Sequence, residues 1–441
     1  MSVLGDFFHY LIDVVLINYY GWTLFAGLLF WMIFYLKREE NNHVYLSGIE
    51  WVFLEVKIDE LNEKSPLAME QIFTALHAIH QNFTFGERFN GRSVLNVSCE
   101  IVSLGGKVSF IFRIPARFRN LLESAIFAQY PKAEVFETED YLRNLPHDYD
   151  PKHADFDFWG TEWLKKKDNA YPIRTYMLDS SFEHGAQETF IDPLSNVIEV
   201  MSNLQPYELL VFQLVIKPVD DSWKEHTKHL VDKLKGVPEK HGDDWVFRIM
   251  HFIPDLLARI LVGIVSGPEE GHTAPVKVQE EPPTLMIHKT DVEKSVINAI
   301  EHAVSKIGYE VRIRTFYLAP KDKINKAVRI PEIVGAFRNF DEVNLNGFKP
   351  DIGHSWTEGP SYKLSERLER PYVEASKLTR KRHMLHWITS RSHWRGVGKV
   401  IMNTEELATI FHFPQVPHTR ISQMERVQTV KSAPPMDLPI G

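Results

Sequence analysis

The stretch GWTLFAGLLFWMIFYL, residues 21–36, contains no charged side chain and decides how the rest of the chain is organised. At a helical rise of about 1.5 Å per residue, the apolar run from Val14 to Leu36 spans roughly 34 Å, enough to cross the hydrocarbon core of a bilayer. Trp22 lies near one end of the run and Tyr35 near the other, where aromatic rings favour the membrane interfaces. The sequence therefore predicts a membrane anchor over residues 1–44.

The residues that flank this run predict its orientation. Lys37 and Arg38 follow it directly, whereas residues 1–36 contain no Lys or Arg. Because basic residues stay on the cytoplasmic side, we expect a single-pass protein of the inner membrane, with its N-terminus outside and its bulk in the cytoplasm. A signal peptide is disfavoured because the start lacks a basic region and a small-residue cleavage site. A core helix is disfavoured because such a helix rarely lacks a polar face over this length.

The composition of the chain indicates what class of protein follows the anchor. The roughly 400 residues after the anchor are too many for one compact core, so we expect two or three domains. The single cysteine, Cys99, excludes an intramolecular disulfide and suits a reducing compartment. The formal net charge of −8 means that any contact with nucleic acid must be local.

Periodicity predicts an α+β fold for the first part of the body. Apolar and polar residues alternate over residues 51–58, 93–102 and 107–114, which is typical of half-buried strands, and Gly105-Gly106 supplies a turn. Helices are expected after Ser65-Pro66 and after Pro115, and a last strand over residues 133–138. The order strand-helix-strand-strand-helix-strand predicts a ferredoxin-like sandwich over residues 45–150.

Residues 151–235 and 285–415 follow a looser version of the same plan, so we expect a second ferredoxin-like α/β domain. Thr290 and Glu293 form a capping box that opens one of its helices. The expected strands are Tyr171–Met177, Tyr207–Lys217 and Tyr309–Phe316, and further helices begin near Asp192, at Trp223 and after Pro331.

An insertion is predicted over residues 236–284, between polar flanks rich in proline and glycine. Its centre, Trp245–Val265, carries one apolar stripe, with charges on the other side that exclude a normal membrane span. An amphipathic helix on the membrane or against a partner fits this pattern, and so does a core helix of the second domain. Residues 416–441 are predicted to be a flexible tail.

Sequence motifs for catalysis are missing. The glycine clusters at residues 105–107 and 396–399 lack the hydroxyl residue of a phosphate-binding loop, so we expect turns. The pairs His77/His80 and His226/His229 have no evident carboxylate or cysteine partner that would complete a metal site. Cys99 lies on the apolar face of a strand and is expected in the core. We therefore expect no enzyme activity, no cofactor and no metal.

The strongest local charge lies between residues 363 and 399, where Trp387 and Trp394 are interleaved with basic side chains. Such a stretch suits contact with single-stranded nucleic acid or with anionic lipid headgroups. The alternative is a solvated basic face or a docking surface for an acidic partner. The candidate contacts are Lys377, Arg380, Lys381, Arg382, Arg391, Arg395 and Lys399.

Residues 403–414, NTEELATIFHFP, resemble the segment that closes the N-terminal region of conjugative coupling-type ATPases of type IV secretion. The likeness is strongest to membrane-anchored members with an uncharacterised N-terminal domain, common in candidate-phyla bacteria. Residues 123–135, 287–320, 335–340, 345–350 and 433–441 resemble the same family. In its fused members a motor domain with a nucleotide-binding loop follows, whereas this chain stops at Gly441. The resemblance therefore implies a stand-alone subunit whose motor is a separate polypeptide.

The leading hypothesis is a membrane-anchored, non-catalytic subunit of a type IV secretion-like apparatus for DNA or protein transfer. The expected partners are the lipid bilayer, a separate translocating ATPase, single-stranded DNA and further copies of the chain. Leu407, Ile410 and Phe411 share one face of a short helix and are the candidate contacts to the motor; the alternative is a terminal helix packed on its own domain. The rival hypothesis is a membrane-tethered module that binds nucleic acid or lipid without a motor.

Overall fold

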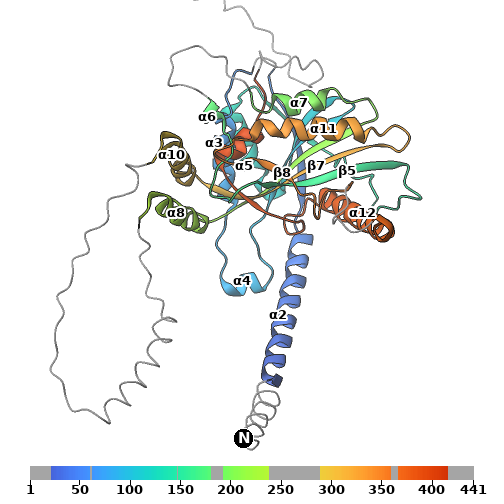
Figure 1. Ribbon diagram of the computed structural model, residues 1–441, viewed down its shortest axis with the longest axis horizontal. Coiled ribbons are helices and arrows are strands. Elements are labelled where there is room, and N and C mark those ends of the chain that lie inside the picture. The colour runs from blue at the N-terminus through green and yellow to red at the C-terminus, as the bar shows by residue number, and fades with distance from the viewer. Residues whose placement is uncertain are drawn as a thin grey trace, which may run out of the picture. The chain divides into compact units, whose positions relative to one another are not determined.

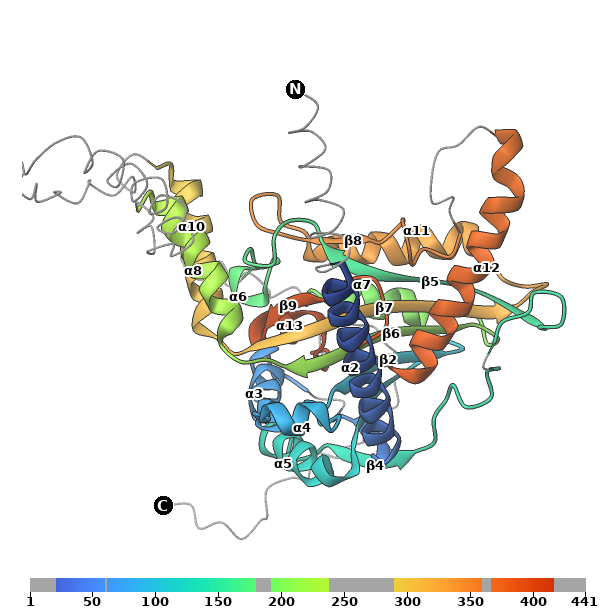
Figure 2. The same cartoon turned by 90° about the horizontal axis from the view of Figure 1, so that it is seen from below.

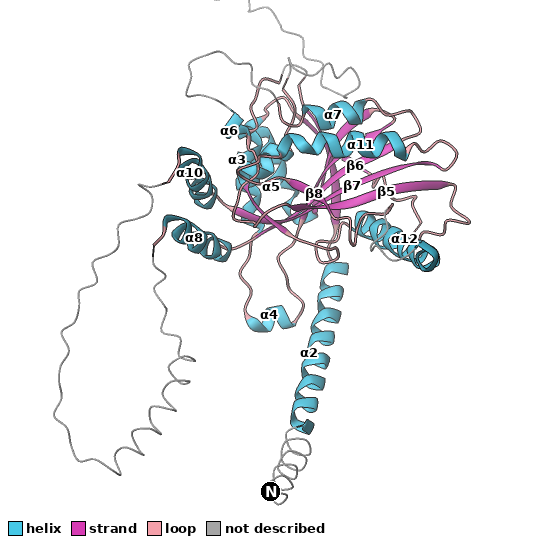
Figure 3. Cartoon of the chain, viewed as in Figure 1, coloured by secondary structure: helices cyan, strands magenta, loops and turns pink. Residues whose placement is uncertain are grey.

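The strands of the described residues form one antiparallel sheet of nine strands with helices packed on it, so the predicted α+β class is confirmed (Figures 1 and 3). The computed structural model describes residues 21–59, 62–146, 148–179, 192–237, 289–358 and 366–415. The strands are β1 Trp51–Lys57, β2 Val97–Leu104, β3 Lys107–Pro115, β4 Glu134–Thr138, β5 Phe156–Lys165, β6 Leu209–Pro218, β7 Gly308–Pro320, β8 Phe348–Pro350 and β9 Val400–Asn403. Their order is β4-β1-β3-β2-β6-β7-β5-β8, and β9 pairs with β7.

Helices of two kinds accompany the strands. The α-helices are α2 Gly21–Ser47, α3 Leu67–Leu76, α4 Phe85–Phe89, α5 Arg119–Gln129, α6 Tyr176–Asp179, α7 Ser195–Ser202, α8 Ser222–Lys235, α10 Asp291–Ser305, α11 Lys326–Phe337, α12 Glu366–Ser390 and α13 Thr404–Ile410. The short 3-10 helices are η2 His77–Ile79, η3 Ala116–Phe118 and η6 Arg338–Phe340.

The sheet consists of two halves with one connectivity. The first half runs β1-α3-β2-β3-α5-β4 and the second β5-α7-β6-β7-α11-β8. Each places its strands in the spatial order fourth, first, third, second. The halves meet where β2 pairs antiparallel with β6, with Glu100 opposite Gln213. The two predicted α/β domains therefore share one sheet, and one core cluster runs through both.

The larger core covers one face of the sheet. Strand side chains such as Leu54 and Phe112 are fully buried there against helix side chains such as Phe73 and Ile126. The predicted inward positions of β1, β2, β3 and α3 are buried as expected, Cys99 included. The turn between β2 and β3 is confirmed at two glycines whose φ angles are +62° and +86°, a conformation that glycine adopts without strain.

A smaller core covers the opposite face, where α12 lies (Figure 2). Met384, Leu385 and Ile388 of α12 are fully buried against the sheet. The contact is close, because a Cβ atom at Gly160 of β5 would lie 2.7 Å from Cγ of Met384. This face is therefore covered over the second half of the sheet.

Two predicted elements of the second half are wrong, and one strand was not predicted. Residues 172–175 are irregular and lead into α6, whereas a strand was predicted over Tyr171–Met177. The strand of this region is β5, which sequence periodicity missed because a glycine and two polar residues interrupt its apolar run. Helix α11 begins at Lys326 and contains Pro331, so it does not begin after that proline.

Residues Ser222–Ser305 form a compact unit of their own. It contains α8 and α10, which pack together and are joined by an ion pair between Lys235 and Glu301. The capping box of Thr290 and Glu293 is confirmed, because each accepts a backbone N–H of the other. The predicted amphipathic helix over Trp245–Val265 lies outside the described residues, as does the predicted tail after residue 415.

Among the described residues, no helix combines the length and apolar composition that crossing a membrane requires. Helix α2 contains the charge-free stretch of residues 21–36, while the first part of the predicted anchor, residues 1–20, lies outside the described residues.

Candidate functional site

The predicted basic contacts lie on α12 and on the loop of residues 391–399 that follows it. Most of them form ion pairs with acidic side chains of other parts of the fold. Lys377 lies 2.9 Å from Glu358, Arg382 3.0 Å from Asp148, Lys399 3.0 Å from Glu310 and Arg391 2.9 Å from Glu100, and Lys381 pairs with Asp157. The side chain of Arg380 is 5% exposed and donates to the carbonyl of Ser376. Arg395 donates to Nε2 of His386 at 2.9 Å. Binding of nucleic acid to these residues remains a prediction.

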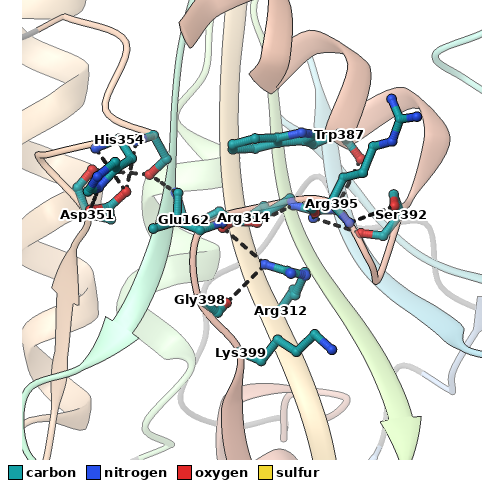
Figure 4. A network of polar contacts seen from close by, with 12 residues as sticks. Glu162, Arg312, Arg314, Asp351, His354, Trp387, Ser392, Arg395, Gly398 and Lys399 are labelled. Carbon is teal, nitrogen blue, oxygen red and sulfur yellow. Dashed lines mark hydrogen bonds and ion pairs between the residues drawn. The ribbon is translucent and has the colours of Figure 1, made fainter. Parts of the chain in front are cut away.

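Beneath the loop lies a largely buried ion network, which we define as Glu100, Asp140, Glu162, Arg312, Arg314 and Arg391. Figure 4 shows the part of it around Glu162, Arg312 and Arg314. Arg312 and Arg314 are alternate residues of β7, so both point to the face that α12 covers. Nε of Arg314 lies 2.9 Å from Glu162 and Nη1 of Arg312 lies 3.4 Å from it. All three of these side chains are at most 3% exposed.

The two arginines of β7 also hold the loop backbone. Arg314 donates to the carbonyls of Ser392 at 2.8 Å and Arg395 at 2.7 Å. Arg312 donates to the carbonyls of Gly398 at 3.1 Å and Trp394 at 3.2 Å. Because hydrogen bonds from a charged donor are stronger than neutral ones, these contacts fix the loop on the sheet.

Arg391 ties the loop to the first half of the sheet. Its guanidinium binds both carboxylate oxygens of Asp140 at 2.7 Å and Oε1 of Glu100 at 2.9 Å. The ring of Phe53 lies 4.7 Å from its guanidinium carbon. Its backbone φ is +50°, which costs energy for a side chain of this size and is held by these contacts.

Burial and neighbouring carboxylates shift the pKa values of the buried arginines in opposite directions. Burial lowers the pKa of Arg314 to about 10, although Glu162 favours the charged form. For Arg391, burial also disfavours the charge, but Glu100, Tyr141 and Asp140 outweigh it and raise its pKa. His393 in the same loop is 1% exposed, and burial lowers its pKa to about 3, so its ring is neutral near pH 7. Its Nε2 lies 3.1 Å from the carbonyl of Glu310.

The predicted contacts to the motor do not lie near α12 and its loop but in α13 and at its C-terminal end. Leu407, Ile410 and Phe411 are fully buried, and the ring of Phe411 packs against those of Phe110 and Phe112. Every residue of α13 is buried. A partner could therefore reach this face only if α13 left the core.

Buried ion pairs hold α13 in that core. Lys165 lies 2.8 Å from Glu406, and both side chains are at most 4% exposed. Lys306 lies 2.6 Å from Glu405 and 2.7 Å from Glu70. Asn403 caps the helix, because its side chain accepts the N–H of Glu406 at 2.8 Å. A charged helix is thus buried because its carboxylates are paired.

One part of the basic segment stays at the surface. Trp394 is 44% exposed, and the ammonium groups of Lys217 and Lys399 lie 4.9 and 5.0 Å from its ring centre. Arg395 is exposed beside it in sequence. We call these four residues the Trp394 surface. It is the part of the predicted contact region that offers both a ring face and positive charge.

Sites for small molecules and metals are limited in the described residues. The pocket beside Val56 and Phe413 and the pocket beside Phe212 and Phe337 each measure about 10 Å³, the room of about one water molecule. Neither pocket has room for a substrate larger than water. Within the described ranges, no group of three or more His, Cys, Asp or Glu side chains is placed to hold a metal ion.

The ion network was not predicted as a unit. Arg312 and Arg314 alternate with apolar residues in the predicted strand Tyr309–Phe316, but the sequence did not indicate that α12 and the loop would cover their face. Two arginines on one face of a long strand were the available signal, since such a pair needs carboxylate partners if the face is buried. Glu162 lies in β5, the strand that periodicity missed.

Comparison with known proteins adds a family. A family model described as Domain of unknown function (DUF8128) matches residues 35–426. No curated protein matches the chain.

Proposed function

The chain belongs to this DUF8128 family, and from its own residues we propose that it is a membrane-anchored, non-catalytic assembly module whose body faces the cytoplasm. The proposal gives the N-terminal helix the role of anchor and the nine-stranded sheet the role of scaffold.

The exposed apolar side chains of α2 carry this proposal. Nine large apolar residues between Phe25 and Leu36 are exposed, and Phe30 reaches 72%. Successive helix residues are about 100° apart, so these side chains surround the helix on all sides. Burying each one fully is worth about 1.5–3 kcal/mol. A bilayer supplies that burial along the whole circumference, whereas one partner helix covers a single stripe.

The flanking charges support the direction of insertion. Lys37 and Arg38 follow the apolar run within α2, and Lys37 pairs with Glu40 at 2.9 Å in an exposed position. These residues suit the cytoplasmic headgroup layer. The body would then begin at β1, a few residues beyond the end of α2.

We also propose that each half of the sheet is a ferredoxin-like sandwich and that the two are fused at β2 and β6. The shared strand order and the shared element order of the halves support this reading. Two similar halves in one sheet give a broad, rigid scaffold, which suits assembly.

The type IV secretion-like role rests on the resemblance of residues 403–414. If an ATPase docks on this body, it uses a surface other than α13, because that helix is buried. The chain purified from membranes should have no ATP turnover of its own, and turnover should appear only with a separate ATPase that carries a nucleotide-binding loop. Turnover by the purified chain alone would contradict this proposal.

Extraction from cell membranes tests the anchor. The full chain should stay in the membrane pellet after washing at alkaline pH. The double substitution Leu29→Arg, Ile33→Arg should release it, because a charged residue at the centre of a spanning helix costs about 2.5–3.5 kcal/mol. Val44→Arg is the matched control, since Val44 is 65% exposed on α2 but lies outside the apolar run. Release of the unmodified chain by the wash would contradict the proposal.

A second candidate function, binding of single-stranded nucleic acid, is favoured by the Trp394 surface. A ring with neighbouring cations suits base stacking beside phosphates. Trp394→Ala with Arg395→Gln should then weaken binding to single-stranded DNA and reduce its salt dependence. Equal binding by this variant and the unmodified chain would reject this surface as the site.

A further inference from the structure

An arm of the first half leaves the sheet and lies beside α2. Residues 80–96 connect η2 to β2 and carry α4, whereas residues 203–208 make the equivalent connection from α7 to β6 in the second half. Figure 1 shows α4 on the side of the sheet from which α2 extends. We call residues 80–93 the α4 arm. It is an addition that the shared connectivity of the halves does not need.

The arm is fastened along α2 by aromatic and polar contacts. The ring of Phe34 stacks on Phe89 at 4.9 Å and on Phe85 at 6.2 Å. Asn41 donates to the carbonyl of Phe89 at 2.9 Å. Gly91 fits closely here, because its φ is +84° and a Cβ atom would lie 2.2 Å from the carbonyl oxygen of Asn41. The position of the arm along α2 is therefore fixed.

The tip of the arm is ordered without a core of its own. No residue of α4 is buried, and Phe85 is 76% exposed. Thr84 and Glu87 form a capping box, and Arg92 pairs with Glu87 at 2.9 Å. A short helix with local bonds thus presents a large apolar ring to the outside. Its stability comes from the cap and from the contacts with α2, and most of the Phe85 ring remains exposed.

The level of the tip along α2 matches a membrane interface. Phe34 lies in the apolar run, three residues before Lys37, which is about 4.5 Å along a helix axis. An amphipathic segment at a bilayer surface buries its apolar face by roughly 5–10 Å. Phe85, which contacts Phe34, is thus at the depth where the apolar run meets the headgroups, and Arg88 is exposed beside it.

We propose that the α4 arm is a second membrane contact, which inserts Phe85 into the bilayer surface beside α2; this rests on the proposed anchor. The occupant is the lipid surface, with Arg88 and Arg92 toward anionic headgroups. The arm packs beside α2, so the two membrane contacts together restrict rotation of the sheet about the anchor. The arm therefore sets which face of the sheet meets the membrane.

Fluorescence of the full chain in vesicles tests this contact. Phe85→Cys receives an environment-sensitive dye, and Cys99 does not compete because it is fully buried. The vesicles contain phosphatidylcholine and phosphatidylglycerol, with or without lipids that carry a quencher in the upper acyl chain. We expect a blue-shifted emission at position 85, quenched at least half as strongly as a dye at position 29. Phe136→Cys is the control, because Phe136 is 44% exposed on the edge strand β4 and should show no quenching.

The outcomes separate the two proposals. Quenching at position 29 without quenching at position 85 would overturn the arm contact and leave the anchor intact. Absence of quenching at position 29 would overturn the anchor. A blue shift at position 85 without lipid quenching would mean that a protein covers Phe85, which would also overturn the lipid contact. Phe85→Asp should leave the thermal unfolding temperature unchanged, since no residue of α4 is buried.

Discussion

Helices α2 and α13 show that the polarity of a helix sequence does not by itself determine whether the helix is buried or exposed. Helix α2 carries uncharged apolar residues over sixteen positions, yet most of its large side chains are exposed. Helix α13 carries two glutamates in seven residues, TEELATI, and all seven are buried. The charged helix is inside because Lys165 and Lys306 neutralise its carboxylates. The apolar helix is exposed because the body covers it only along one stripe, where the α4 arm packs on Phe34.

The largest expected effect is on α13. Replacing both Leu407 and Phe411 by Asp places two uncompensated charges in the core, so the body should fail to fold. The milder Phe411→Ala should lower the free energy of unfolding by about 3–5 kcal/mol, because it removes ring contacts and leaves a cavity. Chemical unfolding of the full chain in detergent measures this change. If the double variant were as stable as the unmodified chain in this experiment, α13 would again be a candidate docking surface.

The ion pairs of α13 should matter nearly as much. Lys165→Ala leaves Glu406 buried without its cation and should cost about 3–5 kcal/mol of unfolding free energy. Lys37→Ala is the matched control on α2, because its pair with Glu40 is exposed and worth at most about 1 kcal/mol. Equal costs for the two substitutions would contradict the difference between the helices.

A moderate effect concerns the loop above the ion network. The pKa of His393 is lowered to about 3 by burial, with Glu310, Lys217 and Lys399 around it. Below about pH 6.5 the unfolded chain binds a proton that the folded chain does not, so the folded state loses stability as the pH falls toward 3. The loss should approach about 1.4 kcal/mol per pH unit. The variant His393→Gln should show a slope smaller by one proton, measured by unfolding at several pH values; an unchanged slope would mean that the ring is protonated or exposed.

The smallest effect is expected on α2. Leu28→Ala and Phe30→Ala should change the unfolding free energy of the body by less than about 0.5 kcal/mol, because these side chains touch little of it. A cost of several kcal/mol, seen in the same unfolding experiment, would show that the body does cover this helix.

Sequence reasoning succeeded where one face of an element is buried. The strands β1 and β3 alternate as predicted because their outer face over the first half is partly open, as at Glu55, whose partner is Ser109 at 2.7 Å. It missed β5, where Gly160, Thr161 and Glu162 interrupt the apolar run. Strand β6 is buried almost throughout as well, but its nearly continuous apolar run still predicts a strand. The partners of Arg312 and Arg314 come from β5 and from the distant loop of residues 391–399, and no local pattern indicates which distant segments will cover a strand.

Accessibility of spin labels along residues 25–36 tests the central claim most directly. The full chain is placed in vesicles, and each label reports its collisions with oxygen, which enters the bilayer, and with a water-soluble nickel complex, which does not. For a membrane anchor we predict high oxygen and low nickel accessibility at every position between Phe25 and Ile33, with no helical period. A period of 3.6 residues, with one stripe shielded and the other exposed to nickel, would mean that α2 packs on a protein surface and would contradict the account.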